Sequence, residues 1–315
     1  MEYRSLGNTG ILVSRLCFGA LTIGPFQANL EIEQGARVIR HALESGVNFI
    51  DTAQLYATYP YIRKAIEGIK NKVVIATKSY AYTAKDMRSS LEEALRSINR
   101  DYIDIFLLHE QESILTMKGH WEAVEYLIKA KNEGLVRAIG ISTHSVEAVK
   151  AAFLIPEFEI IHPLINISGI GIKDGTREEM LAAIQESASY GKGLYGMKAL
   201  GGGNLLDQVD QALNFVISIP QLASIAMGMS SVWEVDFNVS YFSGREIRKE
   251  LRERVSRQKR RLLIESWCTG CGQCIQKCDL GAIKLVENRP VVNQEICRLC
   301  GYCGSVCPDL CIRVV

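Results

Sequence analysis

The sequence predicts an α/β fold, in which a (β/α)8 TIM barrel is followed by a small α+β domain. Two observations support this prediction. In the first 245 residues, short apolar runs alternate with amphipathic stretches, the pattern of parallel strands covered by helices. Nine of the ten cysteines then fall between Cys268 and Cys311, which indicates a domain boundary before them. We therefore divide the chain into a barrel over 1–245, a basic linker helix over 246–261 and a cysteine-rich domain over 262–315.

Eight strand–helix units follow one another along the first part of the chain. The predicted strands are the runs RLCFG, NFID, VVIATK, IDIFLLH, AIGIS, EIIHPLIN, LYGMK and SIAMG. The helices that follow them are predicted at 31–45, 61–67, 84–98, 121–132, 146–153, 178–190, 206–217 and 232–241. Eight units of this size match a closed barrel of about 250 residues. An open doubly wound sheet is disfavoured, because no GxGxxG follows the first strand.

Two of these helices carry the clearest local signals. In the third, Met87, Leu91 and Ile98 recur at helical intervals behind the capping sequence that begins at Thr83. In the sixth, Thr176 and Glu179 have the spacing of a capping box. We expect both helices to begin directly after their threonine.

The charge balance excludes several classes of function. The chain has 36 basic and 35 acidic residues and a net charge of +1, so bulk electrostatic binding to nucleic acid or to a membrane surface is not expected. No apolar run reaches the roughly 18 residues of a membrane span, and residues 1–10 lack the apolar core of a signal peptide. We expect a soluble, cytoplasmic protein.

The cysteine-rich domain contains the pattern CxxCxxCxxxC twice, the second time followed by Pro308. This run is typical of bacterial ferredoxins, in which the fourth cysteine ligates the other cluster. It predicts two 4Fe-4S clusters, one held by Cys268, Cys271, Cys274 and Cys307 and the other by Cys297, Cys300, Cys303 and Cys278. The domain resembles the two-cluster ferredoxin fold, although Asp279 replaces the usual proline. The alternative is a pair of four-cysteine zinc sites. Cys17 and Cys311 are expected to be buried apolar residues.

Polar residues stand at or near the ends of five predicted strands, and a barrel collects such positions at its C-terminal mouth, where barrel enzymes perform their chemistry. These residues are Asp51, Lys78, His109, Ser142 and His162.

Tyr56 lies close in sequence to one of these residues, Asp51. With Asp51, Lys78 and His109, it suggests a site in which a tyrosine acts as general acid. A tyrosine with a pKa near 10 transfers protons poorly at neutral pH unless a cation such as Lys78 lies beside it, and Asp51 can orient that lysine. A neutral His109 can orient a carbonyl oxygen. The set suits carbonyl reduction with Tyr56 as general acid.

The barrel resembles the aldo-keto reductase superfamily. The matching segments are YRSLGNTGILVSRLCFG, GVNFIDTAQLY, VVIATK, SLEEALRSINRDYIDIFLLH and GLVRAIGIS. The resemblance implies a small aldehyde or ketone as substrate, the catalytic tetrad Asp51, Tyr56, Lys78 and His109, and NAD(P)H lying across the mouth as hydride donor.

The resemblance also implies a cofactor site, in which several residues differ from the family pattern. Thr143 replaces an asparagine beside Ser142, His162 replaces a glutamine, and Met197 replaces an aromatic residue that stacks on the nicotinamide. The segment GMSSVWEVDFN resembles the adenosine-phosphate loop but contains no lysine or arginine, so NADH is at least as well suited as NADPH. The remaining implied contacts are Gly201, Gly202 and Gly203 for the pyrophosphate, and Gly228, Ser230, Glu234 and Asn238 for the adenosine end.

The linker between the two domains is strongly basic. The run RKELRERVSRQKRR carries eight basic and two acidic residues. We expect a solvated helix. The alternative is a docking face for an acidic electron carrier such as a ferredoxin or flavodoxin.

Three functions are therefore considered. The first is an NAD(P)H-dependent carbonyl reductase with an iron-sulfur domain for electron transfer, redox sensing or structure. Because clusters move single electrons and nicotinamides move hydrides, the second is an electron-transfer protein whose barrel binds a flavin or a partner and moves no hydride. The third is an aldolase-like barrel in which Lys78 forms a Schiff base.

Overall fold

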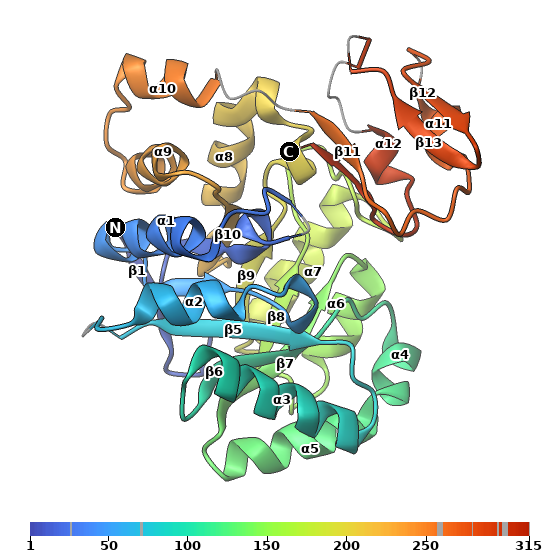
Figure 1. Ribbon diagram of the computed structural model, residues 1–315. Coiled ribbons are helices and arrows are strands. Elements are labelled where there is room, and N and C mark those ends of the chain that lie inside the picture. The colour runs from blue at the N-terminus through green and yellow to red at the C-terminus, as the bar shows by residue number, and fades with distance from the viewer. Residues whose placement is uncertain are drawn as a thin grey trace.

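The computed structural model describes residues 1–25, 27–69, 72–256, 261–278, 280–294, 296–297 and 302–314. Eight parallel strands close into a barrel, which confirms the predicted fold (Figure 1). In chain order these strands are β3 (Leu16–Gly19), β4 (Phe49–Asp51), β5 (Val74–Ser79), β6 (Ile103–Leu108), β7 (Val136–Thr143), β8 (Ile160–Pro163), β9 (Gly193–Met197) and β10 (Ser224–Gly228). The barrel closes where β10 pairs with β3, with Gly228 opposite Gly19.

Helices cover the outside of the barrel. They are α1 (Ile32–Glu44), α2 (Tyr59–Ile66), α3 (Ala84–Ile98), α5 (Trp121–Asn132), α6 (Val146–Phe153), α7 (Arg177–Ser189), α8 (Val209–Ile217) and α9 (Val232–Phe242). These bounds agree with the predicted ranges to within a few residues. The predicted helix at 206–217 is the exception, because its first three residues form a separate 3-10 helix, η4 (Leu206–Gln208).

The predicted caps explain where α3 and α7 begin. Thr83 accepts a hydrogen bond from the backbone N–H of Asp86 at 3.1 Å. Thr176 and Glu179 form a complete capping box, in which each side chain accepts a hydrogen bond from the backbone N–H of the other residue. Both motifs satisfy N–H groups that the first helical turn leaves without partners.

Two apolar cores hold the barrel together. The larger one lies between the strands and the surrounding helices. The smaller one fills the interior of the barrel and includes Phe49, Ile105 and Tyr195. An N-terminal hairpin of β1 (Tyr3–Ser5) and β2 (Leu12–Ser14) adds Leu6 and Val13 to this inner core. The hairpin and the short helix α4 (Ile114–Gly119) are elements that the sequence analysis did not predict.

The linker helix α10 (Lys249–Ser256) exposes its charged residues and packs through one apolar residue. Leu251 is buried and belongs to the larger core, and Arg252 forms an exposed ion pair with Asp210 at 3.0 Å. The charged side of the helix is therefore solvated, as expected, and Leu251 attaches the helix to the barrel. The rest of the predicted linker, 257–260, lies outside the described residues.

The small domain is built from two antiparallel strand pairs and two short helices. β11 (Leu262–Ile264) pairs with β14 (Ile312–Val314), and β12 (Ile283–Val286) pairs with β13 (Arg289–Val292). The helices are α11 (Gln273–Lys277) and α12 (Tyr302–Ser305). β14 also packs against η3 (Gly201–Gly203), the glycine loop that follows β9, so the small domain touches the barrel near its mouth. In the described part of the chain, no helix is long and apolar enough to cross a membrane.

Candidate active site and cysteine cluster

A buried ion pair lies at the C-terminal end of the barrel strands. Lys78 at the end of β5 donates to Asp51 at 2.7 Å and to the backbone oxygen of Thr52 at 2.8 Å. Asp51 also accepts a hydrogen bond from the hydroxyl of Tyr195 at 2.9 Å. Both charged side chains are almost completely buried, so each depends on the other and on these hydrogen bonds for its stability.

Tyr56 and His109 lie beside this pair. The Tyr56 hydroxyl is 3.5 Å from Nε2 of His109, at the long limit of a hydrogen bond, and the two rings meet edge to face. The Lys78 ammonium lies 5.1 Å from the centre of the Tyr56 ring. Among the described residues, no hydrogen bond joins the Tyr56 hydroxyl to Lys78. The structure thus places all four predicted tetrad residues at the mouth, with the ammonium near the phenol ring and the hydroxyl near the imidazole.

The surroundings keep both proton-carrying groups neutral. Burial, with smaller effects from Asp51, Glu110 and Tyr80, raises the pKa of Tyr56 well above its usual value. Burial, with smaller effects from Lys78 and other cations, lowers the pKa of His109 well below its usual value. A neutral phenol is a proton donor and a neutral imidazole can donate one hydrogen bond, as the reduction of a carbonyl requires.

The predicted nicotinamide contacts lie in the same region, but most of them already have protein partners. Ser142 accepts from the backbone N–H of Glu110, and Thr143 donates to the backbone oxygen of Gln111 at 2.6 Å. His162 stacks on Tyr195 and is hydrogen-bonded through Nδ1 to its backbone oxygen at 2.6 Å. These three side chains are almost fully buried, whereas Met197 at the end of β9 is partly exposed.

Other polar atoms at the mouth have no partner. Among the described residues, Nδ1 of His109 and Oε1 of Gln111 are buried and make no hydrogen bond. Buried polar atoms of this kind are rare in folded proteins and call for a ligand or bound water. They are therefore consistent with a small molecule bound at this end of the barrel.

The glycine loop and the start of α9 are the segments that are predicted to hold the pyrophosphate and the adenosine end of the cofactor. Gly201, Gly202 and Gly203 all have positive φ, and a Cβ added at Gly202 would meet no atom within 4 Å, so backbone there is open to a ligand. Glu234 lies in the first turn of α9 and accepts from the backbone N–H of Ser230 at 2.7 Å. Asn238 donates to the backbone oxygen of Glu234 at 2.8 Å. Gly228 at the end of β10 is exposed.

A basic side chain of α10 lies beside the segment GMSSVWEVDFN. The guanidinium of Arg254 lies 3.4 Å from the centre of the Trp233 ring, and Trp233 precedes Glu234 in α9. The sequence analysis missed Arg254 because it searched only the loop itself for a basic residue. The basic run 248–261 was the sequence signal that could have pointed to Arg254.

Several further mouth residues were also missed. Tyr80 stacks on His109 with ring centres 4.3 Å apart and donates to Glu110 at 2.7 Å. His144 is buried, with Nε2 3.8 Å from Glu110. Lys198 directly follows β9. Tyr80 and His144 each lie two positions beyond a predicted strand-end residue, and Lys198 ends the predicted strand LYGMK, so these positions could have identified them.

In the small domain, one predicted ligand set surrounds a common hollow. Cys268, Cys271, Cys274 and Cys307 line it. The backbone N–H of Gly270 donates to Sγ of Cys268 at 3.4 Å, the kind of hydrogen bond that surrounds cluster sulfurs. Cys311 lines the same hollow, with its Sγ 3.3 Å from Sγ of Cys307. It is fully buried, as expected. Among the described residues, no three ligand side chains converge tightly enough for a single metal ion. Four thiols around one hollow are the donor set that a 4Fe-4S cluster uses.

The second predicted ligand set is described only in part. Cys278, Cys297 and Cys303 belong to the apolar core of the small domain. Cys300 and Asp279 lie outside the described residues.

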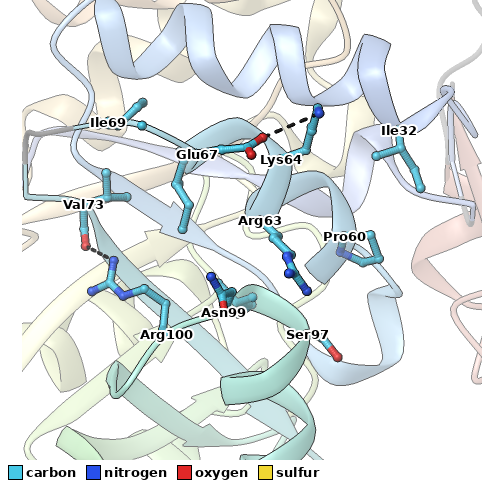
Figure 2. Close-up of a pocket in the computed structure, with 13 residues that line it drawn as sticks. Ile32, Pro60, Arg63, Lys64, Glu67, Ile69, Val73, Ser97, Asn99 and Arg100 are labelled. Carbon is cyan, nitrogen blue, oxygen red and sulfur yellow. Dashed lines mark hydrogen bonds and ion pairs between the residues drawn. The ribbon is translucent and has the colours of Figure 1, made fainter.

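A separate cavity of about 820 Å³ lies on the outside of the barrel, along α2 and beside the end of α3 (Figure 2). It is bounded by α2 and the loop after α3, and the side chains of Arg63, Lys64 and Arg100 border it. Lys64 pairs with Glu67 at 3.5 Å, and Arg100 is hydrogen-bonded to the backbone oxygen of Val73 at 3.4 Å. None of the predicted site residues lies there.

The closed barrel with polar residues at its mouth is typical of an α/β-barrel enzyme, and comparison with known proteins identifies the family. The aldo/keto reductase family model matches residues 15–216, and a 4Fe-4S dicluster domain model matches residues 261–308. The chain therefore belongs to the aldo/keto reductase family and carries a 4Fe-4S dicluster domain at its C-terminal side.

Individual relatives are distant. L-galactose dehydrogenase of Arabidopsis thaliana is 24% identical over 282 residues, which cover 76% of this chain and 88% of that protein. The aldo-keto reductase YhdN of Bacillus subtilis is 28% identical over 187 residues, 53% of this chain and 54% of that protein. The structure of an aldo-keto reductase from Bacillus halodurans superposes with a TM-score of 0.66 at 22% identity and covers 81% of this chain and 95% of that one. At this identity the structural match shows the fold alone.

Proposed function

We propose that the barrel reduces the carbonyl group of a small aldehyde or ketone with NAD(P)H, and that Tyr56 protonates the carbonyl oxygen. The observation that carries this proposal is the placement of a neutral, partly exposed phenol between the buried Asp51–Lys78 pair and His109. Family membership supports it as well, because aldo/keto reductases use this cofactor class.

In this proposal, each residue has a distinct task. The Tyr56 hydroxyl donates its proton to the oxygen as negative charge develops there. His109, with its neutral ring, holds that oxygen in place. Lys78 provides positive potential at the phenol, and Asp51 keeps the ammonium charged and oriented. A bound nicotinamide would supply the hydride. Gly201–Gly203 and the start of α9 would hold its pyrophosphate and adenosine parts.

The iron-sulfur domain requires its own explanation. Hydride transfer moves two electrons together, and clusters exchange single electrons, so neither process drives the other without a relay. We propose that the predicted cysteine ligands hold two clusters that serve electron exchange with a separate carrier, redox sensing or structure. The flavin alternative has no support in the comparisons. Anaerobically purified protein should contain about eight iron atoms per chain.

The test of the reductase is the Tyr56→Phe variant, purified anaerobically. Wild-type protein should oxidise NADH or NADPH when given methylglyoxal or butanal, and Tyr56→Phe should lose at least about 100-fold in kcat/KM. Tyr190→Phe, which removes an exposed phenol at the far end of α7, should behave as wild type. Full activity of Tyr56→Phe would overturn the proposal.

A further inference from the structure

One charged side chain at the mouth has no evident task in this scheme. Lys198 follows β9 directly, next to Met197, and its backbone has φ of +57°. This left-handed conformation is unfavourable for a residue with a side chain. It is held in place because the carbonyl of Lys198 accepts from the backbone N–H of Gly201 at 2.8 Å. The fold thus fixes Lys198 between the barrel strand and the glycine loop.

The ammonium of Lys198 differs from those of the other lysines at the mouth. Lys78 is paired with Asp51, and Lys173 is paired with Glu112. Lys198 is partly buried and, among the described residues, makes no hydrogen bond or ion pair through its side chain. Withdrawing a cation from water without a partner is costly, and a bound anion removes that cost.

Lys198 lies at the carboxyl end of β9, at the same mouth of the barrel as the tetrad residues. Its charge lowers the pKa of both His109 and His144, so it lies within electrostatic reach of the tetrad. Burial lowers the pKa of Lys198 itself, and Glu110 opposes that effect. The Glu110 carboxylate accepts a hydrogen bond from Tyr80 at 2.7 Å and lies 3.8 Å from His144. Among the described residues, no hydrogen bond or ion pair joins Glu110 to Lys198, so the ammonium can still pair with the anion of a ligand.

We propose that Lys198 binds a carboxylate or phosphate group of the molecule that occupies the mouth of the barrel. The inference rests on the proposed function. If the anion belongs to the substrate, the preferred substrates are carbonyl compounds that also carry a carboxylate or phosphate. If it belongs to the cofactor, Lys198 binds the pyrophosphate.

The experiment compares two aldehydes that differ in one charge. 4-Oxobutanoate carries a carboxylate, and butanal has the same chain length without it. With full-length protein, Lys198→Met should raise KM for 4-oxobutanoate by about 10- to 100-fold, the value of one charge-assisted hydrogen bond, and leave butanal nearly unchanged. Lys198→Arg should restore much of the loss. Lys173→Met serves as the matched control, because that lysine is already paired.

The outcomes separate the two sources of the anion. If Lys198→Met instead weakens NADH binding in a fluorescence titration and lowers kcat/KM for both aldehydes equally, the anion is the cofactor's pyrophosphate. If neither the aldehydes nor the cofactor respond to Lys198→Met, the inference is wrong.

Failure of the proposed function gives a different result. If wild-type protein reduces neither aldehyde, the reductase proposal fails, and binding alone then tests Lys198. In that case, either succinate or inorganic pyrophosphate should raise the thermal unfolding midpoint of wild type but not of Lys198→Met. Equal shifts in both proteins with both anions would overturn the assignment of Lys198.

Discussion

Tyr195 shows how much a single residue contributes to this site. Its hydroxyl donates to Asp51, its backbone oxygen holds His162, and its ring stacks on His162. This one residue of β9 therefore fixes the carboxylate that orients Lys78. Its position, 144 residues beyond Asp51 in the chain, becomes meaningful only when the barrel closes.

The buried Asp51–Lys78 pair should matter for stability as well as activity. Lys78→Met leaves the Asp51 carboxylate buried without its counter-ion, which should cost about 3–5 kcal/mol in the free energy of unfolding. Urea denaturation followed by tryptophan fluorescence measures this loss. Lys64→Met breaks only an exposed pair with Glu67 and should cost at most about 1 kcal/mol. Equal stability of the two variants would contradict the burial of the pair.

Buried histidines should make the protein sensitive to acid. Burial lowers the pKa of His162 to about 4, against the raising effect of Asp51. Between pH 6.5 and 4, the unfolded chain thus binds a proton at this histidine that the folded chain does not, and stability falls as pH falls. His162→Gln should reduce the slope of the unfolding free energy against pH by up to about 1.4 kcal/mol per pH unit. Thermal unfolding midpoints at pH 7.5 and 5.5 test this, with His120→Gln as control.

At the scale of elements, local sequence signals fixed most boundaries. Thr83 and Thr176 mark helix starts because their hydroxyls bind backbone N–H groups a few residues away. The convergence of Asp51, Lys78 and His109 could be predicted for a similar reason, because strand ends converge in any closed barrel. The hairpin β1–β2 escaped prediction, since its three-residue strands are too short for a periodic pattern.

Helix α10 shows what local signals leave out. Its basic composition correctly suggests a solvated face, but it does not reveal that Leu251 is buried or that Arg252 and Arg254 contact the barrel. Only the packing of α10 against α9 brings Arg254 to Trp233. Sequence alone could not place a cation from α10 beside the segment that is predicted to bind the adenosine end of the cofactor.

This arrangement predicts a cofactor preference. If Arg254 binds a ribose 2′-phosphate, Arg254→Ala should raise Kd for NADPH about tenfold and change Kd for NADH less than about twofold. Fluorescence titration of both nucleotides measures this. Arg252→Ala removes a neighbouring cation that is paired with Asp210 and should leave both values near wild type. A uniform change in both nucleotides would show that Arg254 only stabilises the loop.

At the scale of the whole molecule, the paired cysteine runs make the small domain predictable, because ligand spacing is a local property. For Cys311, the sequence predicted the burial but not the contact with Cys307. That contact depends on the turn that brings β14 back to β11.

The two neighbouring cysteines should respond differently to substitution. Cys307→Ala removes a proposed ligand and should lower the iron content and the visible absorption near 400 nm. Cys311→Ala should retain both, because Cys311 stands outside the repeated pattern. Iron and sulfide assays on anaerobic protein make the comparison. Equal loss in the two variants would make Cys311 a ligand.

The contact between β14 and the glycine loop joins the two halves of the molecule. β14 begins at Ile312, directly after Cys311, and its other side meets Gly201–Gly203. If this loop moves when the clusters or the dinucleotide bind, the two binding events are coupled. Thermodynamic linkage then requires that each changes the affinity for the other by the same factor. In a cell that is short of iron, the barrel would then bind the dinucleotide with a different affinity than in an iron-replete cell.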